Sequence, residues 1–191
     1  MESKDSDRRI VRPHAMRRRD FLRLGTTATA TLLASPVLAG TRSPAERQLA
    51  FKNTHTGEGV STVYWAAGDY ISDGLAEIND VLRDHRTDEI HPIDTKLLEM
   101  LFLLQAKTGS RQAYEVISGY RSPATNAALR NKSSGVAKRS FHMRGKAIDI
   151  RLPGIELKNL QQAALDLRAG GVGYYPGSGF IHVDVGPTRS W

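Results

Sequence analysis

The residue types best suited to chemistry gather in two short stretches near the end of the chain. Residues 140–149, SFHMRGKAID, contain His142 and Asp149, and residues 180–185, FIHVDV, contain His182. We expect both stretches to contribute strands to one sheet, because polar and aliphatic residues alternate along them. A carboxylate on a buried strand face is costly unless it is paired or binds a metal, so Asp149 needs a partner on that face.

These three side chains have the chemistry of a metal site. Two histidines and one aspartate suit zinc, and three protein ligands leave the fourth position open, as in catalytic zinc centres. The sequence contains no cysteine, so any metal must be held by His, Asp or Glu. A histidine on a strand is more often an ordinary hydrogen-bonding residue, and the spacing alone leaves both interpretations open.

Three ordered motifs resemble a known family over about residues 60–191. Residues 140–149 resemble the Ser-x-His-x-x-Gly-x-Ala-x-Asp signature of the zinc D-Ala-D-Ala peptidases and related murein endopeptidases, whose fold is shared with hedgehog signalling domains. Residues 117–130, ISGYRSPATNAALR, look like the upstream Ser-Gly-Tyr-Arg-Ser element of this group. Residues 180–191, FIHVDVGPTRSW, are similar to the closing strand of its exported branch.

The resemblance implies a function and assigns roles. His142, Asp149 and His182 would be zinc ligands, and Arg121 would bind a substrate carboxylate or stabilise the developing oxyanion. The implied activity is that of a zinc-dependent peptidoglycan peptidase, an endopeptidase that hydrolyses the peptide crosslinks of murein, with peptide stems as substrate. Two alternatives stay open: a D,D-carboxypeptidase, and a non-catalytic, zinc-containing module that binds the cell wall.

The general base departs from the family pattern. Many members carry a Glu three residues before the last ligand, or a His two residues before it, and here those positions hold Gly179 and Phe180. Neither can accept a proton. Asp184 is the nearest carboxylate along the sequence, and we predict either that it is the catalytic base or that it orients His182 as a ligand.

The remaining sequence predicts the elements that position these residues. Asp94 and Ser122 are expected helix N-caps, the second followed by a proline at the first helical position. We expect one α+β domain with a small antiparallel sheet flanked by helices. The predicted strands cover residues 62–65, 114–118, 146–151, 172–175 and 180–185, and the predicted helices cover residues 75–83, 94–109, 122–129 and 157–169.

The N-terminus has the pattern of an export signal. Arg18 and Arg19 precede x-Phe-Leu, a weakly apolar stretch rich in Thr and Ala follows, and Val37-Leu38-Ala39 fits a small-x-small cleavage site. We predict a twin-arginine (Tat) signal peptide over residues 1–39, an extended linker over 40–60 and a zinc peptidase domain over 61–191.

The distribution of charge along the chain indicates which kinds of partner to expect. The formal net charge is +7, but residues 1–39 hold eight Lys and Arg against four Asp and Glu, which leaves +3 for the rest of the chain without a long basic run. This pattern argues against a nucleic-acid partner. We expect a periplasmic monomer with no membrane attachment after signal cleavage. His55, His85 and His91 are expected to face solvent, and Tyr175 and Trp191 to pack or to line the cleft.

Overall fold

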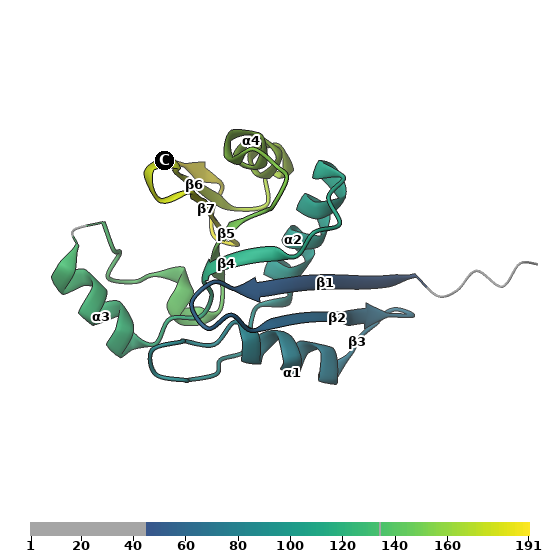
Figure 1. The fold of residues 1–191 in the computed structure, drawn as a ribbon, viewed down its shortest axis with the longest axis horizontal. Coiled ribbons are helices and arrows are strands. Elements are labelled where there is room, and N and C mark those ends of the chain that lie inside the picture. The colour runs from purple at the N-terminus through teal and green to yellow at the C-terminus, as the bar shows by residue number, and fades with distance from the viewer. Residues whose placement is uncertain (1–44, 134) are drawn as a thin grey trace, which may run out of the picture. The chain divides into compact units, whose positions relative to one another are not determined.

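The computed structural model describes residues 45–133 and 135–191, which form an eight-stranded sheet with four α-helices (Figure 1). The predicted signal peptide over residues 1–39 lies outside the described residues. The strands are β1 (Glu46–Asn53), β2 (Gly59–Ala66), β3 (Asp69–Tyr70), β4 (Tyr114–Ser118), β5 (Ala147–Arg151), β6 (Gly171–Tyr175), β7 (Phe180–Asp184) and β8 (Arg189–Ser190). The helices are α1 (Ser72–Val81), α2 (Thr95–Thr108), α3 (Pro123–Lys132) and α4 (Leu157–Leu167), with short 3₁₀ turns η2 (Phe141–Arg144) and η3 (Pro176–Ser178).

The two predicted helix caps are confirmed. The Asp94 side chain accepts a hydrogen bond from the backbone amide of Lys96, and α2 ends at Gly109, which adopts the left-handed conformation (φ 67°). The Ser122 hydroxyl oxygen accepts from the amide of Thr125 at the start of α3. These local signals therefore fix where both helices begin.

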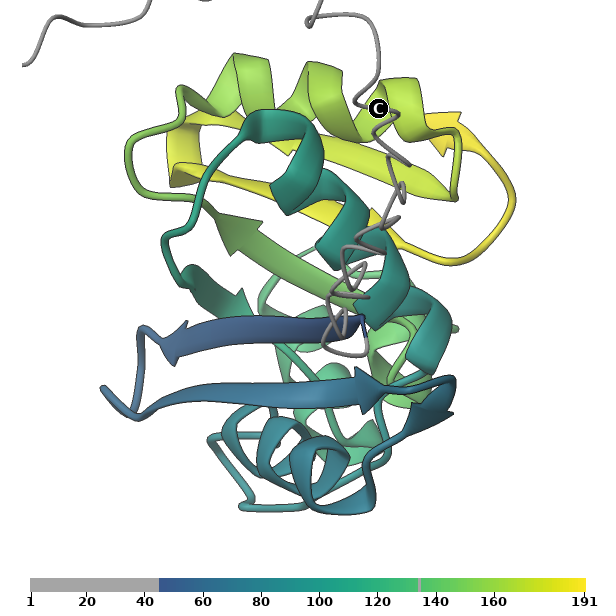
Figure 2. The same ribbon diagram turned by 90° about the vertical axis from the view of Figure 1, so that its right-hand side faces the viewer.

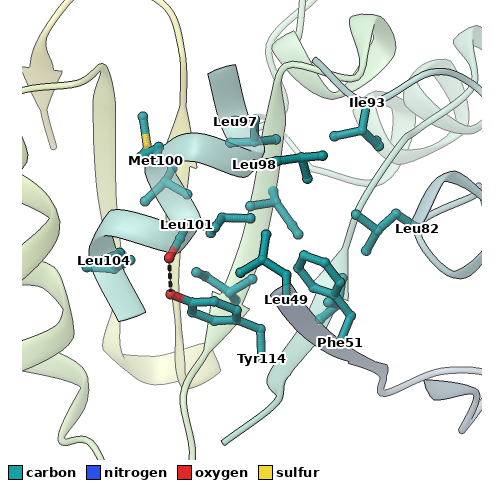
Figure 3. Close-up of a cluster of buried hydrophobic side chains, with 14 of the residues drawn as sticks. Leu49, Phe51, Leu82, Ile93, Leu97, Leu98, Met100, Leu101, Leu104 and Tyr114 are labelled. Carbon is teal, nitrogen blue, oxygen red and sulfur yellow. Dashed lines mark hydrogen bonds between the residues drawn. The ribbon is translucent and has the colours of Figure 1, made fainter. Parts of the chain in front are cut away.

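The hydrophobic core lies between the sheet and α2. Figure 2 shows α2 crossing the strands, with α4 lying along β6 and β7 and α1 at the other end of the sheet. One face of α2 is buried against Leu49 and Phe51 of β1 and Tyr114 of β4 (Figure 3). The Tyr114 hydroxyl donates to the carbonyl oxygen of Leu101 at 2.8 Å, so this buried polar group is satisfied. The buried α2 residues are Leu97, Leu98, Met100, Leu101 and Leu104.

The α+β class is as predicted, but the small antiparallel sheet is wrong. The strand order is β3-β2-β1-β4-β5-β7-β6-β8, and the β1–β4 and β6–β8 pairs are parallel. The linker predicted over residues 40–60 is also wrong from Glu46 onward, because β1 lies inside the sheet between β2 and β4. Leu49 and Phe51 lie on the same face of β1 and are buried, a pattern that the polar content of this segment obscures.

Strand register aligns four residues in one row across the sheet. Ser118 of β4 pairs with Asp149 of β5, Asp149 pairs with His182 of β7, and His182 pairs with Gly173 of β6. Directly paired residues on neighbouring strands point to the same face, so this row gathers three polar side chains beside one position that has none. Among the described ranges, no helix is both long enough and apolar enough to cross a membrane.

Candidate metal centre

The structure brings His142, Asp149 and His182 together. His142 Nε2 lies 3.2 Å from His182 Nδ1, and Asp149 Oδ1 lies 2.8 Å from His182 Nδ1 and 3.3 Å from His142 Nε2. Two ligand atoms at tetrahedral zinc, each about 2.0 Å from the metal, are about 3.3 Å apart. The three predicted ligand atoms therefore already have nearly the spacing that one zinc ion requires.

Hydrogen bonds at the far side of each imidazole fix which nitrogen faces the cluster. His142 Nδ1 lies 2.8 Å from the carbonyl oxygen of Gly119, to which it must donate, and this leaves the lone pair on Nε2. His182 Nε2 lies 3.0 Å from Asp184 Oδ2, so a proton on Nε2 leaves Nδ1 free to bind a metal. Histidine ligands of metals commonly have such acceptors behind them.

The charges around the cluster favour a cation. Burial raises the pKa of Asp149, but the neighbouring His142 and His182 outweigh burial and hold this pKa well below its usual range. Burial lowers the pKa of His182, yet its contacts with Asp149 and Asp184 raise it overall. In the absence of metal, His182 thus attracts a proton between two carboxylates, and a metal ion would replace it.

A short 3₁₀ turn and the hydrogen bonds around it hold His142 in place. It lies in η2, a 3₁₀ turn whose start is capped by the Ser140 hydroxyl. Gly145 ends this turn at φ 62°, and a Cβ there would lie 2.2 Å from the carbonyl oxygen of Pro92. The amide of Arg121 donates to the carbonyl oxygen of His142 at 3.2 Å, which ties the turn to the segment that carries Arg121.

Arg121 lies beside the cluster. Its Nη2 is 3.2 Å from Ser118 Oγ and 3.5 Å from Asp149 Oδ2. Burial lowers the pKa of Arg121 and Asp149 partly offsets this, so the side chain remains a cation at neutral pH. Its buried Nε has no hydrogen-bond partner within residues 45–133 and 135–191.

Asp184 is fully buried, and both oxygens of its carboxylate accept hydrogen bonds. Arg189 contacts both oxygens, at 2.6 and 3.1 Å, and the amide of Gly186 donates to Oδ1 at 2.8 Å. Burial raises the pKa of Asp184, but His182 and Arg189 outweigh burial and lower it well below its usual range. Of the two predicted roles, this geometry favours orienting His182 over accepting a proton from a water molecule in the cleft.

A cavity of about 550 Å³ opens over the cluster. Its wall is basic at Arg121, Arg139 and Arg189, so it suits an anionic substrate. Among the described residues that line it, the carboxylates are those of Asp149 and Asp184. Aromatic side chains form another part of the wall, and they are Phe141, Tyr175, Phe180 and Trp191.

The other described histidines lie outside the cluster. His55 is exposed and stacks on the partly buried His85 with ring centroids 4.1 Å apart. His91, also partly buried, stacks on Tyr120 at 4.6 Å. The expectation that all three face solvent therefore holds fully only for His55.

Sequence reasoning missed two supporting residues. Asp84 is 1% exposed and its carboxylate accepts from the backbone amides of Ser122 and Arg86, at 2.9 and 3.0 Å. Gly119 supplies the carbonyl that orients His142, and a Cβ at this position would lie 2.5 Å from the carbonyl oxygen of Leu82. Both act across segments distant in sequence, which no local spacing reveals.

Comparisons with known proteins match most of the chain. The M15 peptidase family model described as peptidoglycan L,D-endopeptidase MepK matches residues 41–191. Peptidoglycan L,D-endopeptidase MepK of Escherichia coli K12 is 45% identical over 175 residues, which cover 91% of this chain and 96% of the relative. "Probable peptidoglycan L,D-endopeptidase MepK" of Haemophilus influenzae is 44% identical over 176 residues, covering 91% of this chain and 95% of the relative.

Proposed function

Because the chain belongs to the peptidoglycan L,D-endopeptidase MepK family of M15 peptidases, we propose that it is a zinc-dependent endopeptidase that hydrolyses peptide crosslinks between L- and D-configured residues of murein. The observation that carries this proposal is the convergence of His142 Nε2, Asp149 Oδ1 and His182 Nδ1 at mutual distances of 2.8 to 3.3 Å. Two neutral imidazoles and one carboxylate are the donor set of a catalytic zinc centre.

The donor set fits zinc, and His142, Asp149 and His182 are the proposed ligands. Zinc bound there would supply a water of lowered pKa and would polarise the scissile carbonyl. Three ligands from the protein would leave a fourth coordination position open, and these three residues line a cavity that a peptide can enter. The absence of cysteine from the sequence leaves no thiolate to compete for the metal.

Arg121 is the proposed electrostatic group of the site. Its guanidinium is held beside Asp149 and Ser118, and it lines the cavity next to the proposed ligands. A fixed positive charge at this place would stabilise negative charge that develops on the scissile carbonyl oxygen, or bind a neighbouring carboxylate of the stem peptide. Because Arg121 is already positioned, little reorganisation is needed when that charge develops.

A second candidate function follows from the roles of the two carboxylates that line the described part of the cavity. Among the described residues that line the cavity, Asp149 is a proposed ligand and Asp184 is buried and engaged by Arg189. A site without a free base is what a non-catalytic, zinc-containing wall-binding module would have. Turnover distinguishes the two functions, because such a module would bind peptidoglycan without cutting it.

We also propose export to the periplasm through the Tat pathway. The support is the Arg18-Arg19 pair with x-Phe-Leu behind it and the relatives' action on peptidoglycan, which lies outside the cytoplasm. Tat substrates cross the membrane already folded, so zinc would be loaded before export.

Digestion of purified sacculi tests the proposed function. The mature protein is incubated with sacculi with and without a chelator, and the released muropeptides are separated and identified by mass. We expect L,D-crosslinked dimers to disappear and their monomers to accumulate, and the chelator to stop this. His142→Ala serves as the inactive control. Binding to sacculi without release of monomers would instead support the wall-binding module.

A further inference from the structure

Trp191, at the end of the motif that carries His182, lies against the proposed metal centre. Its ring centroid is 5.3 Å from that of His182, and the side chain lines the cavity while remaining 50% exposed. Large aromatic side chains are usually buried in packing, so a half-exposed indole at a catalytic cleft is available to contact a ligand.

Both the backbone and the indole of Trp191 are held by contacts with neighbouring residues. The Trp191 amide donates to the carbonyl oxygen of Val172 at 3.2 Å, and the Tyr174 amide donates to the carbonyl oxygen of Trp191 at 3.0 Å. Nε1 donates to the Tyr175 hydroxyl at 2.7 Å. The Arg189 guanidinium lies 4.9 Å from the ring centroid. These contacts hold Trp191 as one wall of the cavity.

Gly173 makes room for this wall. It pairs with His182 in the row across the sheet, and a Cβ on Gly173 would lie 2.7 to 2.8 Å from three atoms of the indole. Real Cβ contacts do not come this close, so any larger residue would push the indole out of its place. The residue type at position 173 therefore controls how closely Trp191 approaches the metal centre.

The position of Trp191 beside the metal centre determines which residue of a bound substrate can contact its indole. One peptide residue spans about 3.3–3.6 Å, so a group that contacts Trp191 while the scissile carbonyl lies at the metal centre belongs to a residue next to the scissile bond. Exchanging L for D at that residue swaps the positions of its side chain and its hydrogen. A flat, fixed surface on one side of the backbone accepts the hydrogen more readily than the side chain.

We infer that Trp191 is a specificity-determining residue, which selects the configuration of the residue beside the scissile bond and so favours L,D- over D,D-crosslinks. This inference rests on the proposed function. The metal centre and Arg121 can fix the carbonyl and a carboxylate, but distinguishing two configurations needs a further contact outside that set. Trp191 supplies it next to His182.

The test compares cleavage of two soluble muropeptide dimers, one L,D-crosslinked and one D,D-crosslinked. The ratio of their kcat/KM values is measured for the wild type, Trp191→Ala and Gly173→Ala, together with zinc content. We expect the L,D preference to fall by about tenfold or more in Trp191→Ala and to fall in Gly173→Ala, with about one zinc per chain in both, since a misfitted apolar contact commonly changes selectivity on this scale. Tyr70→Ala is the matched control, because Tyr70 is 45% exposed on β3 at the opposite edge of the sheet.

Each outcome has one meaning. An equal fall for both dimers, an unchanged ratio, or loss of zinc from Trp191→Ala would overturn the inference and leave the proposed function standing. Failure of the wild type to cleave either dimer would overturn the proposed function and the inference with it. If the wild type cleaves only the L,D dimer, the D,D dimer is measured as a competitive inhibitor, and its inhibition constant must fall relative to the KM of the L,D dimer in Trp191→Ala.

Discussion

His182 Nε2 and Asp184 Oδ2 lie 3.0 Å apart, so two side chains on the same face of β7 are joined by a hydrogen bond. Arg189 and the amide of Gly186 hold the carboxylate from the other side. Asp184 is therefore fixed independently of the histidine, and it determines that Nδ1 of His182 is the nitrogen that faces Asp149.

Asp184→Asn is expected to weaken zinc binding. An amide in place of the carboxylate accepts a weaker hydrogen bond from His182 Nε2 and can also present its NH₂ group there. His182 is then less well oriented, and its Nδ1 is less basic. Loss of such a partner typically reduces metal affinity about 10- to 100-fold. Zinc titration of the stripped protein measures the affinity, and excess zinc should restore sacculus digestion.

The same variant tests the alternative that Asp184 is the catalytic base. In that case zinc affinity would be unchanged and turnover would fall roughly 10²-fold or more, without rescue by zinc. If neither quantity changes, Asp184 has no role in the site, and the base must come from another residue or the protein is not an enzyme.

Single substitutions of the proposed ligands should abolish stoichiometric zinc. We expect His142→Ala and His182→Ala to retain far less than one zinc per chain in elemental analysis, because two remaining donors bind zinc weakly. His55→Ala is the matched control, since His55 is exposed and lies outside the cluster. Full occupancy in either ligand variant would refute the assignment.

The sequence predicts those features of the site that depend on neighbouring residues, and it does not predict those that depend on residues far apart in the chain. Alternation along β5 and β7 predicts which residues share a face within each strand, because strand periodicity is local, whereas the register that pairs Asp149 with His182 comes from the tertiary fold. The hydrogen bond between His142 and the Gly119 carbonyl oxygen joins residues 23 apart, and their residue types do not predict it. The sequence does not predict strand β1, because its buried residues Leu49 and Phe51 stand in a largely polar segment.

Asp84 should make stability depend on acid pH. Burial raises its pKa, but hydrogen bonds from Thr125, Ser122 and Arg86 outweigh this and lower the pKa from 3.8 to about 2. Because the folded-state pKa is the lower one, the stabilisation is fully present above about pH 4 and is lost as the pH falls through about 2. The contribution is on the order of 2 kcal/mol.

Denaturant unfolding between pH 5 and 2.5 measures this effect. The difference in unfolding free energy between the wild type and Asp84→Asn should shrink as the pH falls, since protonation removes from the wild type what the variant already lacks. Asp69→Asn, at an exposed position on β3, should follow the wild type at every pH. A constant difference for Asp84→Asn would contradict the prediction.

Export should depend on the arginine pair. Replacing Arg18 and Arg19 together by lysine keeps the charge but removes the guanidinium groups, so precursor should accumulate in the cytoplasm. Fractionation followed by immunoblotting measures this. Export of the double variant at the wild-type level would show that the signal is not read by the Tat pathway.

Zinc reconstitution tests the central claim most directly. The mature protein is stripped with a chelator, zinc is returned in increasing equivalents, and hydrolysis of an L,D-crosslinked muropeptide dimer is followed at each step. Activity should be absent at the start, rise in proportion to zinc and level off at about one equivalent per chain. Full activity in the stripped protein, or no activity in a folded protein that has taken up one zinc, would contradict the account.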